Sequence, residues 1–262
     1  MNIHSTAVLG ENVSLGENVK IGAYAIVEDG AVLGDGCVVE PHAKICSSAR
    51  IGRNCRLCSF AVVGGEPQDL HFDSSTVSFV ELGDNSVVRE SSTIHRATVA
   101  GASTKIGKNA FLMASSHIGH DCVAGDNFIL GCFAALAGHV KVANDVFVSG
   151  GVMIHQRVRI GDGVIASGNS AASMDIPPYV IAFSRNLLGG LNLVGMNRRK
   201  MPREDIAEVK ALYARVFATH SVRRNALEAI AEGAAKTAAG KNFLDFFTPD
   251  GRHYLTPRKL AD

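Results

Sequence analysis

The stretch IHSTAVLGENVSLGENVKIGAYAIVEDGAVL, residues 3–33, carries an aliphatic residue at every sixth position. From Ile3 the same step continues to Val63, and each position on it is Ile, Leu or Val. The step resumes over residues 82–94 and again over residues 106–172. A period of six fits neither a helix of 3.6 residues per turn nor a simple alternating strand. It predicts short parallel strands joined by tight turns.

Two other positions of each hexad support this interpretation when the aliphatic residue is counted as the first. The fifth position is nearly always small or β-branched, as at Ala7, Val13, Val19, Ala25, Ala31, Cys37, Ala43, Ala49, Cys55, Ala61, Ala110, Ser116, Cys122, Ala134 and Val140. Glycine favours the second position, next to the expected turn, where its backbone freedom is useful. The pattern resembles the hexapeptide-repeat family, whose fold is the left-handed parallel β-helix. In that fold three hexads form one triangular coil, and coils stack about 4.8 Å apart.

The repeat also explains several cysteines. Cys37, Cys55 and Cys122 fall on the small fifth position, so we expect them inside the coils, where a thiol behaves as a small hydrophobe. The six cysteines show no paired spacing that would indicate a disulfide framework or a zinc ribbon.

Composition excludes several classes of function. The 262 residues include 26 basic and 25 acidic side chains, so no overall positive charge favours nucleic acid as a partner. The N-terminus lacks the pattern of a signal peptide, and no run of 18 apolar residues indicates stable membrane insertion. We therefore expect a cytoplasmic protein.

The chain is expected to divide into two parts. Residues 1–183 form the mainly β part, a β-helix with an inserted loop at about 64–80 and a second, short interruption at 100–104. Residues 184–262 form a C-terminal α-helical domain, reached through a connector over 181–200 that follows the double proline of DIPPYV. Pro202 suits the first turn of a helix, and apolar residues at 206, 209, 212, 213 and 216 have helical spacing. Further helices are predicted over 225–240 and 241–249.

The segment ASSHIGHDC, residues 114–122, gathers side chains that can bind metal or move protons. Its two histidines, His117 and His120, occupy different hexad positions and are expected to point in different directions. At 18 residues per coil, His120, His139 and His155 should share one edge of three adjacent coils. His120 would act as a base with Asp121 fixing its tautomer, since neutral histidine can accept a proton near pH 7. A zinc site and a hydrated polar ladder remain alternatives.

Longer motifs make the resemblance specific. GEPQDL, VRESSTIHRAT, SSHIGHDC, LAGHV, GGVMIHQ and DIPPYVIA, followed by GLNLVGMNRRK, resemble the UDP-N-acetylglucosamine O-acyltransferase family of lipid A biosynthesis over nearly the whole chain. The resemblance implies transfer of a (3R)-3-hydroxyacyl chain from acyl carrier protein to the sugar 3-position of UDP-N-acetylglucosamine. It implies a homotrimer with the site between subunits, and neither a cofactor nor a metal.

The resemblance also assigns roles to residues. It implies that His120 is the general base, that Asp121 orients it, and that the Gly138 N–H stabilises the oxyanion. In the substrate site, it places Gln68 and Asp69 on the sugar, His117 and His139 along the site, His155 and Gln156 near the pyrophosphate or nucleotide, and Gly168 beside the acyl tail. It places Asn192 and Arg199 on the uridine diphosphate, and Arg198 on the phosphopantetheine or nucleotide phosphates. Glycine at 168 leaves room for a longer acyl chain. Basic residues from 198 to 203 would also suit an acidic carrier protein.

Three departures from the family pattern leave the acceptor open. His71 stands where the family often has a lysine in the loop, Val194 where many members have glutamate, and Arg157 where they have phenylalanine. Loss of the loop lysine allows a UDP-linked 3-amino sugar as the acceptor, which would make the chain an N-acyltransferase. A zinc-dependent hydratase resembling the γ-class carbonic anhydrases and a non-catalytic trimeric scaffold are the remaining hypotheses. The other histidines, including His4, His42 and His95, are expected to face solvent.

Overall fold

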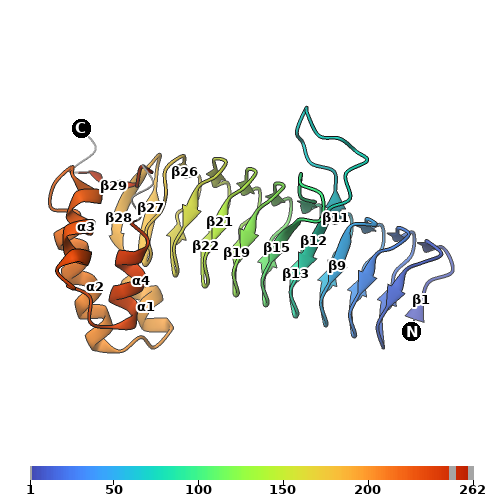
Figure 1. The fold of residues 1–262 in the computed structure, drawn as a ribbon. Helices are drawn as coiled ribbons and strands as arrows, with labels where there is room; N and C mark the ends of the chain where they lie inside the picture. Colours follow the sequence, from blue (N-terminus) through green and yellow to red (C-terminus); the bar gives the residue numbers. More distant parts are fainter. Residues whose placement is uncertain (1, 248–251, 259–262) are drawn as a thin grey trace.

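The computed structural model describes residues 2–247 and 252–258. The chain forms a long three-sided prism with helices at its C-terminal end and one large loop projecting from its side (Figure 1). The prism is the predicted left-handed parallel β-helix, which is confirmed. None of the helices in these residues is long and apolar enough to cross a membrane.

Three sheets form the sides of the prism, and strands that follow one another in the chain lie in different sheets. The first sheet contains β1 Asn2–Ile3, β4 Lys20–Ile21, β7 Val38–Val39, β10 Arg56–Leu57, β13 Val87–Val88, β16 Phe111–Leu112, β19 Ile129–Leu130, β22 Phe147–Val148, β25 Ile165–Ala166, β27 Val180–Phe183, β28 Leu187–Leu191 and β29 Thr256–Pro257. The second contains β2 Val8–Leu9, β5 Ile26–Val27, β8 Lys44–Ile45, β11 Val62–Gly65, β14 Thr93–His95, β17 His117–Ile118, β20 Ala135–Leu136, β23 Met153–Ile154 and β26 Ala171–Ala172. The third contains β3 Ser14–Leu15, β6 Val32–Leu33, β9 Ala49–Ile51, β12 Phe79–Leu82, β15 Ser103–Ile106, β18 Val123–Ala124, β21 Lys141–Val142 and β24 Arg159–Ile160.

The six-residue period arises because each repeat is a two-residue strand, with one residue outward and the next inward, followed by a turn into the next sheet. In β19, Ile129 is half-buried and Leu130 is fully buried, and both pair with residues 18 positions later in β22. The fifth hexad position fills the corner of the core, where Cys37, Cys55 and Cys122 are at most 1% exposed, as predicted. The inward residues of successive coils stack into one continuous core. Burial of each aliphatic side chain stabilises the folded state by about 1.5–3 kcal/mol.

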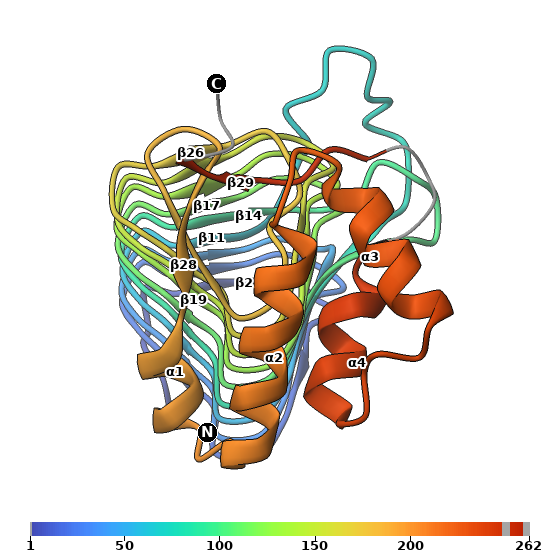
Figure 2. The same cartoon turned by 90° about the vertical axis from the view of Figure 1, so that its left-hand side faces the viewer.

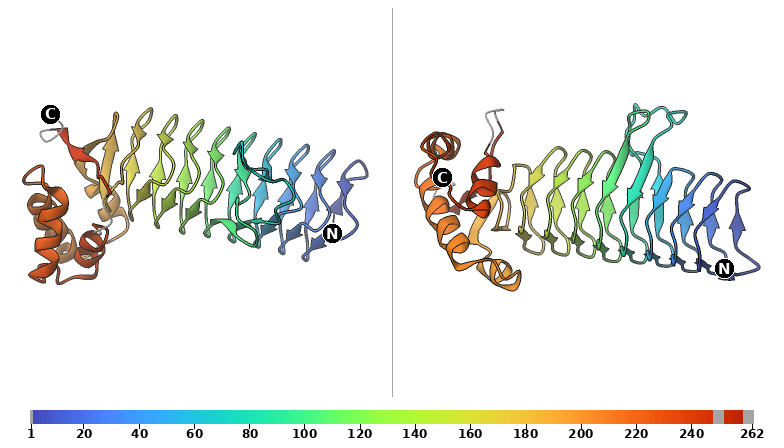
Figure 3. Two further views of the ribbon diagram at one scale, coloured as in Figure 1. Left: turned by 45° about the horizontal axis from the view of Figure 1, so that its top comes forward. Right: turned by 60° about the horizontal axis from the view of Figure 1, so that its bottom comes forward.

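Two interruptions enlarge neighbouring coils. Arg56 of β10 pairs with Val87 of β13, a separation of 31 residues in place of 18, because residues 66–78 leave the prism as a loop (Figure 3). The next coil is also enlarged, by the shorter excursion 96–102. Hydrogen bonds join the two excursions. The Gly101 N–H donates to the Val77 oxygen at 2.8 Å, and the Ser78 hydroxyl donates to the Ala97 oxygen at 2.5 Å.

The connector predicted over 181–200 is wrong, because this stretch has regular structure. β27 and β28 form an antiparallel hairpin that extends the first sheet, and it spans the expected domain boundary at residues 183 and 184. The short helix α1 Leu193–Arg198 follows, with the Asn192 side chain accepting from the Gly195 N–H at its start.

The C-terminal helices cover the end of the prism (Figure 2). α2 Arg203–Val216 begins directly after Pro202 and buries residues 206, 209, 212 and 216, as the spacing predicts. The single helix predicted over 225–240 is wrong. α3 Val222–Ala231 ends before Gly233, whose φ is +62°, and Thr237 caps the separate helix α4 Ala238–Asp245. α4 includes part of the helix predicted over 241–249, of which residues 248 and 249 lie outside the described residues.

Specific polar contacts join these helices to the last coils. The Arg159 side chain donates to Asp175 at 2.6 Å and to the Phe246 oxygen at 3.2 Å. Asn242 donates to Asp162 at 2.9 Å and to the Tyr179 hydroxyl at 2.7 Å. The end of the β-helix, where backbone groups would otherwise be unpaired, is therefore covered by the chain's own C-terminal part.

Candidate active site

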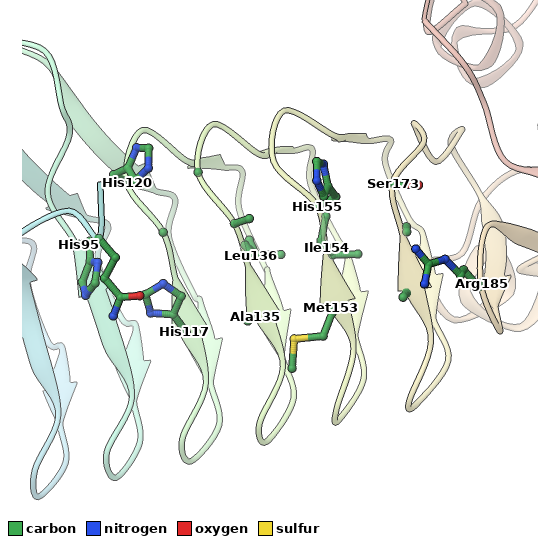
Figure 4. Close-up of a pocket in the computed structure, with 16 residues that line it drawn as sticks. His95, His117, His120, Ala135, Leu136, Met153, Ile154, His155, Ser173 and Arg185 are labelled. Atoms are coloured by element: carbon green, nitrogen blue, oxygen red, sulfur yellow. The ribbon is translucent and has the colours of Figure 1, made fainter. Parts of the chain in front are cut away.

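A cavity of about 540 Å³ lies on the outer face of the second sheet, beside β17, β20, β23 and β26 (Figure 4). Its lining residues are Gln68, His95, His117, Gly119, His120, Ala135, Leu136, Ala137, Gly138, Met153, Ile154, His155, Ala171, Ala172, Ser173 and Arg185. His95, His117 and His120 lie at one end, Leu136, Met153 and Ile154 lie in the middle together with His155, and Arg185 lies at the other end (Figure 4). The cavity therefore combines groups that can move a proton with an apolar strip that runs along the coils.

His120 and Asp121 form a hydrogen-bonded pair at the corner that follows β17. His120 Nδ1 lies 2.8 Å from Asp121 Oδ2, and the two side chains are 16% and 12% exposed. If Nδ1 carries the proton and donates to the carboxylate, Nε2 is left with a free lone pair, the arrangement a general base requires. His139 adds an edge-to-face ring contact with His120 at 5.1 Å, and its Nε2 lies 3.7 Å from Asp121 Oδ2.

The short excursion 96–102 fixes Asp121. Thr98 donates to its carboxylate from the backbone N–H at 3.2 Å and from the hydroxyl at 2.7 Å. In return the Asp121 N–H donates to the Thr104 hydroxyl at 2.8 Å. Burial raises the pKa of Asp121, but the hydrogen bonds from Thr98 and His120 outweigh it, and the net pKa is lowered. The carboxylate therefore remains charged beside His120.

Gly138 lies directly against the His120 ring. A Cβ at this position would lie 2.5 Å from Cε1 and 2.6 Å from Nε2 of His120, so only glycine allows the observed ring position. Within residues 2–247 and 252–258, the Gly138 N–H donates no backbone hydrogen bond. It is thus free to bind an oxygen atom close to the imidazole.

His95 and His117 correct two expectations. His95 is 8% exposed rather than solvent-facing, because β11 extends to Gly65 and this residue pairs with His95. His117 and His120 line one cavity, although they come from different hexad positions, because His117 projects outward from β17 and the chain turns at once to His120. The His95 and His117 rings meet edge to face at 4.7 Å, and Thr93 Oγ1 lies 2.7 Å from His117 Nδ1. Burial lowers the pKa of both, that of His95 to about 4, so both are neutral at pH 7.

The remaining residues of the expected substrate site are only partly brought together. Gln68 and His155 line the cavity, whereas Asp69, His71, His139, Gln156 and Gly168 are not among its lining residues. Asp69 accepts from the His71 N–H at 2.9 Å in the exposed loop. Gly168 lies at the corner between β25 and β26, and a Cβ there would meet only the Gly150 oxygen, at 3.4 Å.

Asn192, Arg198 and Arg199 do not approach His120 within one chain. Asn192 donates to the Gly163 oxygen at 2.9 Å, and the Arg199 guanidinium packs against Gly163, 3.9 Å from Asp145. This is the corner between the third and first sheets, whereas His120 lies at the corner between the second and third. Nε and Nη2 of Arg199 are buried, and neither has a hydrogen-bond partner in the described part of the chain.

A metal could be considered at His120, Asp121 and His139, whose ligand atoms lie within 4.8 Å of one another. Zinc would require ligand atoms at about 2.0–2.2 Å from the ion. The 2.8 Å contact between His120 Nδ1 and Asp121 Oδ2 is that of a hydrogen bond, in which the imidazole N–H donates and the carboxylate oxygen accepts. The arrangement fits a hydrogen-bonded base better than a zinc site.

Among the lining residues that the sequence did not predict as part of the site are four with polar or flexible side chains, His95, Met153, Ser173 and Arg185. Met153 could have been found, because it is an outward strand residue one coil beyond Ala135. Arg185 lies in the hairpin that was expected to be a connector. It also lines a neighbouring cavity of about 630 Å³ between the last coils and α3, together with Arg223, Arg224 and Arg252.

Comparisons with known proteins agree with this geometry. Residues 175–255 match the family described as UDP N-acetylglucosamine O-acyltransferase, domain 2, and residues 30–65 match the bacterial transferase hexapeptide family. The acyl-[acyl-carrier-protein]–UDP-N-acetylglucosamine O-acyltransferase of Campylobacter concisus is 40% identical over 218 residues, which cover 82% of this chain and 83% of the relative.

Solved structures agree over the full length. The UDP-N-acetylglucosamine acyltransferase of Campylobacter jejuni is 36% identical with a TM-score of 0.88, and the comparison covers 98% of this chain and 99% of that one. The enzyme of Francisella novicida is 29% identical with a TM-score of 0.92 over 99% and 98% of the two chains. The fold, the C-terminal helices and the similarity over most of both chains show that this protein belongs to the UDP-N-acetylglucosamine O-acyltransferase family.

Proposed function

We propose that this protein transfers a (3R)-3-hydroxyacyl chain from acyl carrier protein to the 3-hydroxyl of UDP-N-acetylglucosamine, the first step of lipid A biosynthesis. The observation that carries the proposal is the His120–Asp121 pair, which opens into an elongated, largely apolar cavity beside Gly138. The names of two relatives state O-acyl transfer from acyl carrier protein to UDP-N-acetylglucosamine.

The chemistry follows from the tautomer that Asp121 selects. With Nδ1–H donated to Asp121, His120 Nε2 accepts the proton of the sugar hydroxyl as its oxygen attacks the thioester carbonyl. The carbonyl oxygen becomes negatively charged, and the Gly138 N–H would stabilise it. When the C–S bond breaks, the leaving thiolate takes the proton from His120, which regenerates the neutral base. Asp121 remains charged throughout and stabilises the imidazolium.

The rest of the cavity suits the acyl chain. Ala135, Met153 and Ala171 are the outward residues of three successive strands, and with Ile154 they form an apolar strip that leads away from His120. A hydrocarbon chain laid along this strip would bury apolar surface on both sides. Gln68 and His117 stand at the polar end, where the proposal places the sugar.

The nucleotide site in this proposal is completed by another copy of the chain. Asn192, Arg198 and Arg199 would bind the uridine diphosphate of a neighbouring subunit's substrate, because they lie at a different corner from their own His120. The unpaired buried donors of Arg199 support this assignment, since phosphate oxygens suit a guanidinium. A homotrimer is further supported by a row of half-buried apolar side chains along the outer face of the first sheet: Val87, Phe111, Ile129, Phe147 and Ile165.

The basic cavity beside α3 supports an acidic carrier protein as the partner. Arg185 lies in both cavities, so a carrier at Arg223 and Arg224 could direct its thioester along the apolar strip. The buried Nε of Arg223 has no hydrogen-bond partner among the described residues. The proposal includes a cytoplasmic location, which the six free cysteines favour, because thiols persist in a reducing compartment.

The decisive experiment supplies purified protein with 3-hydroxyacyl carrier proteins of several chain lengths and either UDP-N-acetylglucosamine or its 3-amino analogue. Mass spectrometry should detect an ester on the 3-oxygen, and His120→Ala should lower kcat by about 10²–10⁴-fold, the usual contribution of a general base. Exclusive acylation of the amino analogue would replace the O-acyltransferase assignment with the N-acyltransferase. Activity that requires stoichiometric zinc, or survives unchanged in His120→Ala, would contradict the mechanism.

A further inference from the structure

We infer that Arg96 is a positioning residue that clasps the loop 66–78 against the prism and so holds Gln68 at the substrate cavity. The inference deepens the proposed function and rests on it for the identity of the substrate. Arg96 follows His95 directly, but it lies outside the cavity that His95 lines. The side chain is 12% exposed, so it is an internal part of the loop's base.

One guanidinium contacts the loop at its start, its middle and its end. Nη2 lies 3.3 Å from Glu66 Oε1, where the loop leaves the prism. The guanidinium carbon lies 4.8 Å from the centre of the Phe72 ring, near the middle. Nη2 also donates to the Ser74 oxygen at 3.0 Å, and Nη1 donates to the Thr76 oxygen, where the chain returns.

The clasp matters because the loop residues between the buried Pro67 and the half-buried Phe72 project into solvent. Gln68, Asp69, Leu70 and His71 are all exposed, and the Leu70 side chain is fully so. A loop of this kind would otherwise sample many conformations, each with a cost in binding free energy when the substrate orders it. A guanidinium is planar and has five N–H donors in fixed directions, so it can bind several carbonyl oxygens at once. A lysine ammonium lacks this fixed geometry.

Through the loop, Arg96 positions the polar end of the cavity, where Gln68 lies. Gln68 lines the cavity with His95 and His117, and Asp69 is close enough to His139 to raise the pKa of that imidazole, although burial lowers it overall. Arg96 therefore connects the foot of the loop to side chains that the proposed function places around the sugar. It contacts no lining residue of the cavity through the polar contacts described above, so its effect is transmitted through the loop.

Arg50 provides a matched control. Its guanidinium also donates to three backbone oxygens, those of Gly30, Ser47 and Ala49, and lies 4.5 Å from the centre of the Phe79 ring. These partners belong to the coils and to β12 and not to the loop 66–78. Arg50→Ala removes a similar set of contacts without releasing the loop.

The test compares wild type with Arg96→Ala, Arg96→Lys and Arg50→Ala in the full-length protein. In Arg96→Ala, kcat/KM for UDP-N-acetylglucosamine should fall by about 10- to 100-fold, mainly through KM, as expected for misplacement of a substrate-positioning group. KM for the acyl carrier protein should change much less, because its proposed docking site lies beside α3. Arg96→Lys should recover only part of the loss, and Arg50→Ala should remain within about threefold of wild type.

A second readout needs no substrate. Chymotrypsin should cleave after Leu70 or Phe72 at least about tenfold faster in Arg96→Ala than in wild type or Arg50→Ala, because cleavage follows local opening. Wild-type cleavage and wild-type KM in Arg96→Ala would overturn the inference, as would equal losses in Arg50→Ala. If wild type does not acylate the UDP-sugar but Arg96→Ala still releases the loop, the proposed function fails while the clasp stands.

Discussion

Asp121 is held from three sides, and each contact restricts what the neighbouring imidazole can do. Thr98 donates to the carboxylate from its N–H and its hydroxyl, and Thr104 accepts from the backbone N–H of Asp121. His120 Nδ1 makes the third contact, a hydrogen bond to the carboxylate. The residue itself has φ +58°, a left-handed conformation that aspartate and asparagine tolerate better than most residues. A group this constrained cannot turn away when His120 becomes positively charged during the proposed reaction.

The position of the His120 ring leads to a prediction for Gly138→Ala. The added Cβ would overlap the imidazole, so the ring must move away from its observed place. We expect kcat to fall by about 100-fold, since displacement of a base by an ångström has effects of this size. The free energy of unfolding should change by less than about 1 kcal/mol, because the ring can move into the cavity. Gly189→Ala, whose Cβ would lie 3.4 Å from its nearest neighbour, should keep wild-type kcat, and full activity in Gly138→Ala would contradict the assignment.

His95 predicts a dependence of stability on pH. The folded protein resists protonation of His95 until about pH 4, mainly through burial and then through His117 and His120, whereas the unfolded chain is protonated near the ordinary value of 6.5. The unfolded state thus binds more protons between these values, so stability falls as pH falls through this window. Between pH 7 and pH 5 the loss from His95 should be about 2 kcal/mol.

Denaturant unfolding at the two pH values would measure this effect. His95→Asn should lose about 2 kcal/mol less than wild type between pH 7 and pH 5, whatever its stability at pH 7. An identical loss in both proteins would show that His95 does not resist protonation in the folded state.

At the scale of elements, the hexads of residues 3–63 and 106–172 were sufficient to predict the strands and their 18-residue register. The register alone predicted a shared edge for His120 and His155, which both line the cavity, whereas Gln68 and Gly138 were expected only from the family resemblance. His95 was missed because its burial depends on the extension of β11 to Gly65, next to the loop 66–78, and the hexads do not predict this extension. The prediction of a connector over 181–200 was also wrong. The hairpin of β27 and β28 pairs with the edge of the first sheet, and its sequence lacks the six-residue period that predicted the other strands.

The corner of the core offers a prediction about packing. Phe128 is the large exception at the fifth hexad position and is completely buried, with the small residues Ala110 and Val146 on the coils before and after it. Ala110→Phe would place a second ring in the same corner and should lower the free energy of unfolding by about 1–3 kcal/mol or more. Val123→Phe, on an outward position that is 42% exposed, should change it by less than about 0.5 kcal/mol. Equal effects of the two changes, measured by denaturant unfolding, would show that the corner is not tightly packed.

At the scale of the whole molecule, the proposed site requires more than one chain. The apolar row on the first sheet predicts that Ile129→Lys, in its centre, converts a trimer into monomers of 27.6 kDa. Light scattering after size exclusion would measure the mass. Activity should be lost with the trimer, because Arg199 of a second chain would no longer reach the site. Val123→Lys on the third sheet is the control, and a monomeric wild type would contradict the shared site.

The constant register of 18 residues between coils has a consequence for how such proteins diversify. Because every strand in the regular part of the prism pairs with an equivalent strand one coil away, deleting or duplicating a whole coil leaves all hydrogen-bond partners equivalent. The separation between the histidine end of the cavity and Arg185 can therefore change during evolution only in increments of one coil, about 4.8 Å. Substitutions at the lining residues Met153 or Ser173 would change the length of the cavity by less than one coil. Whole-coil insertions and single substitutions would thus adjust the same length in large and small steps.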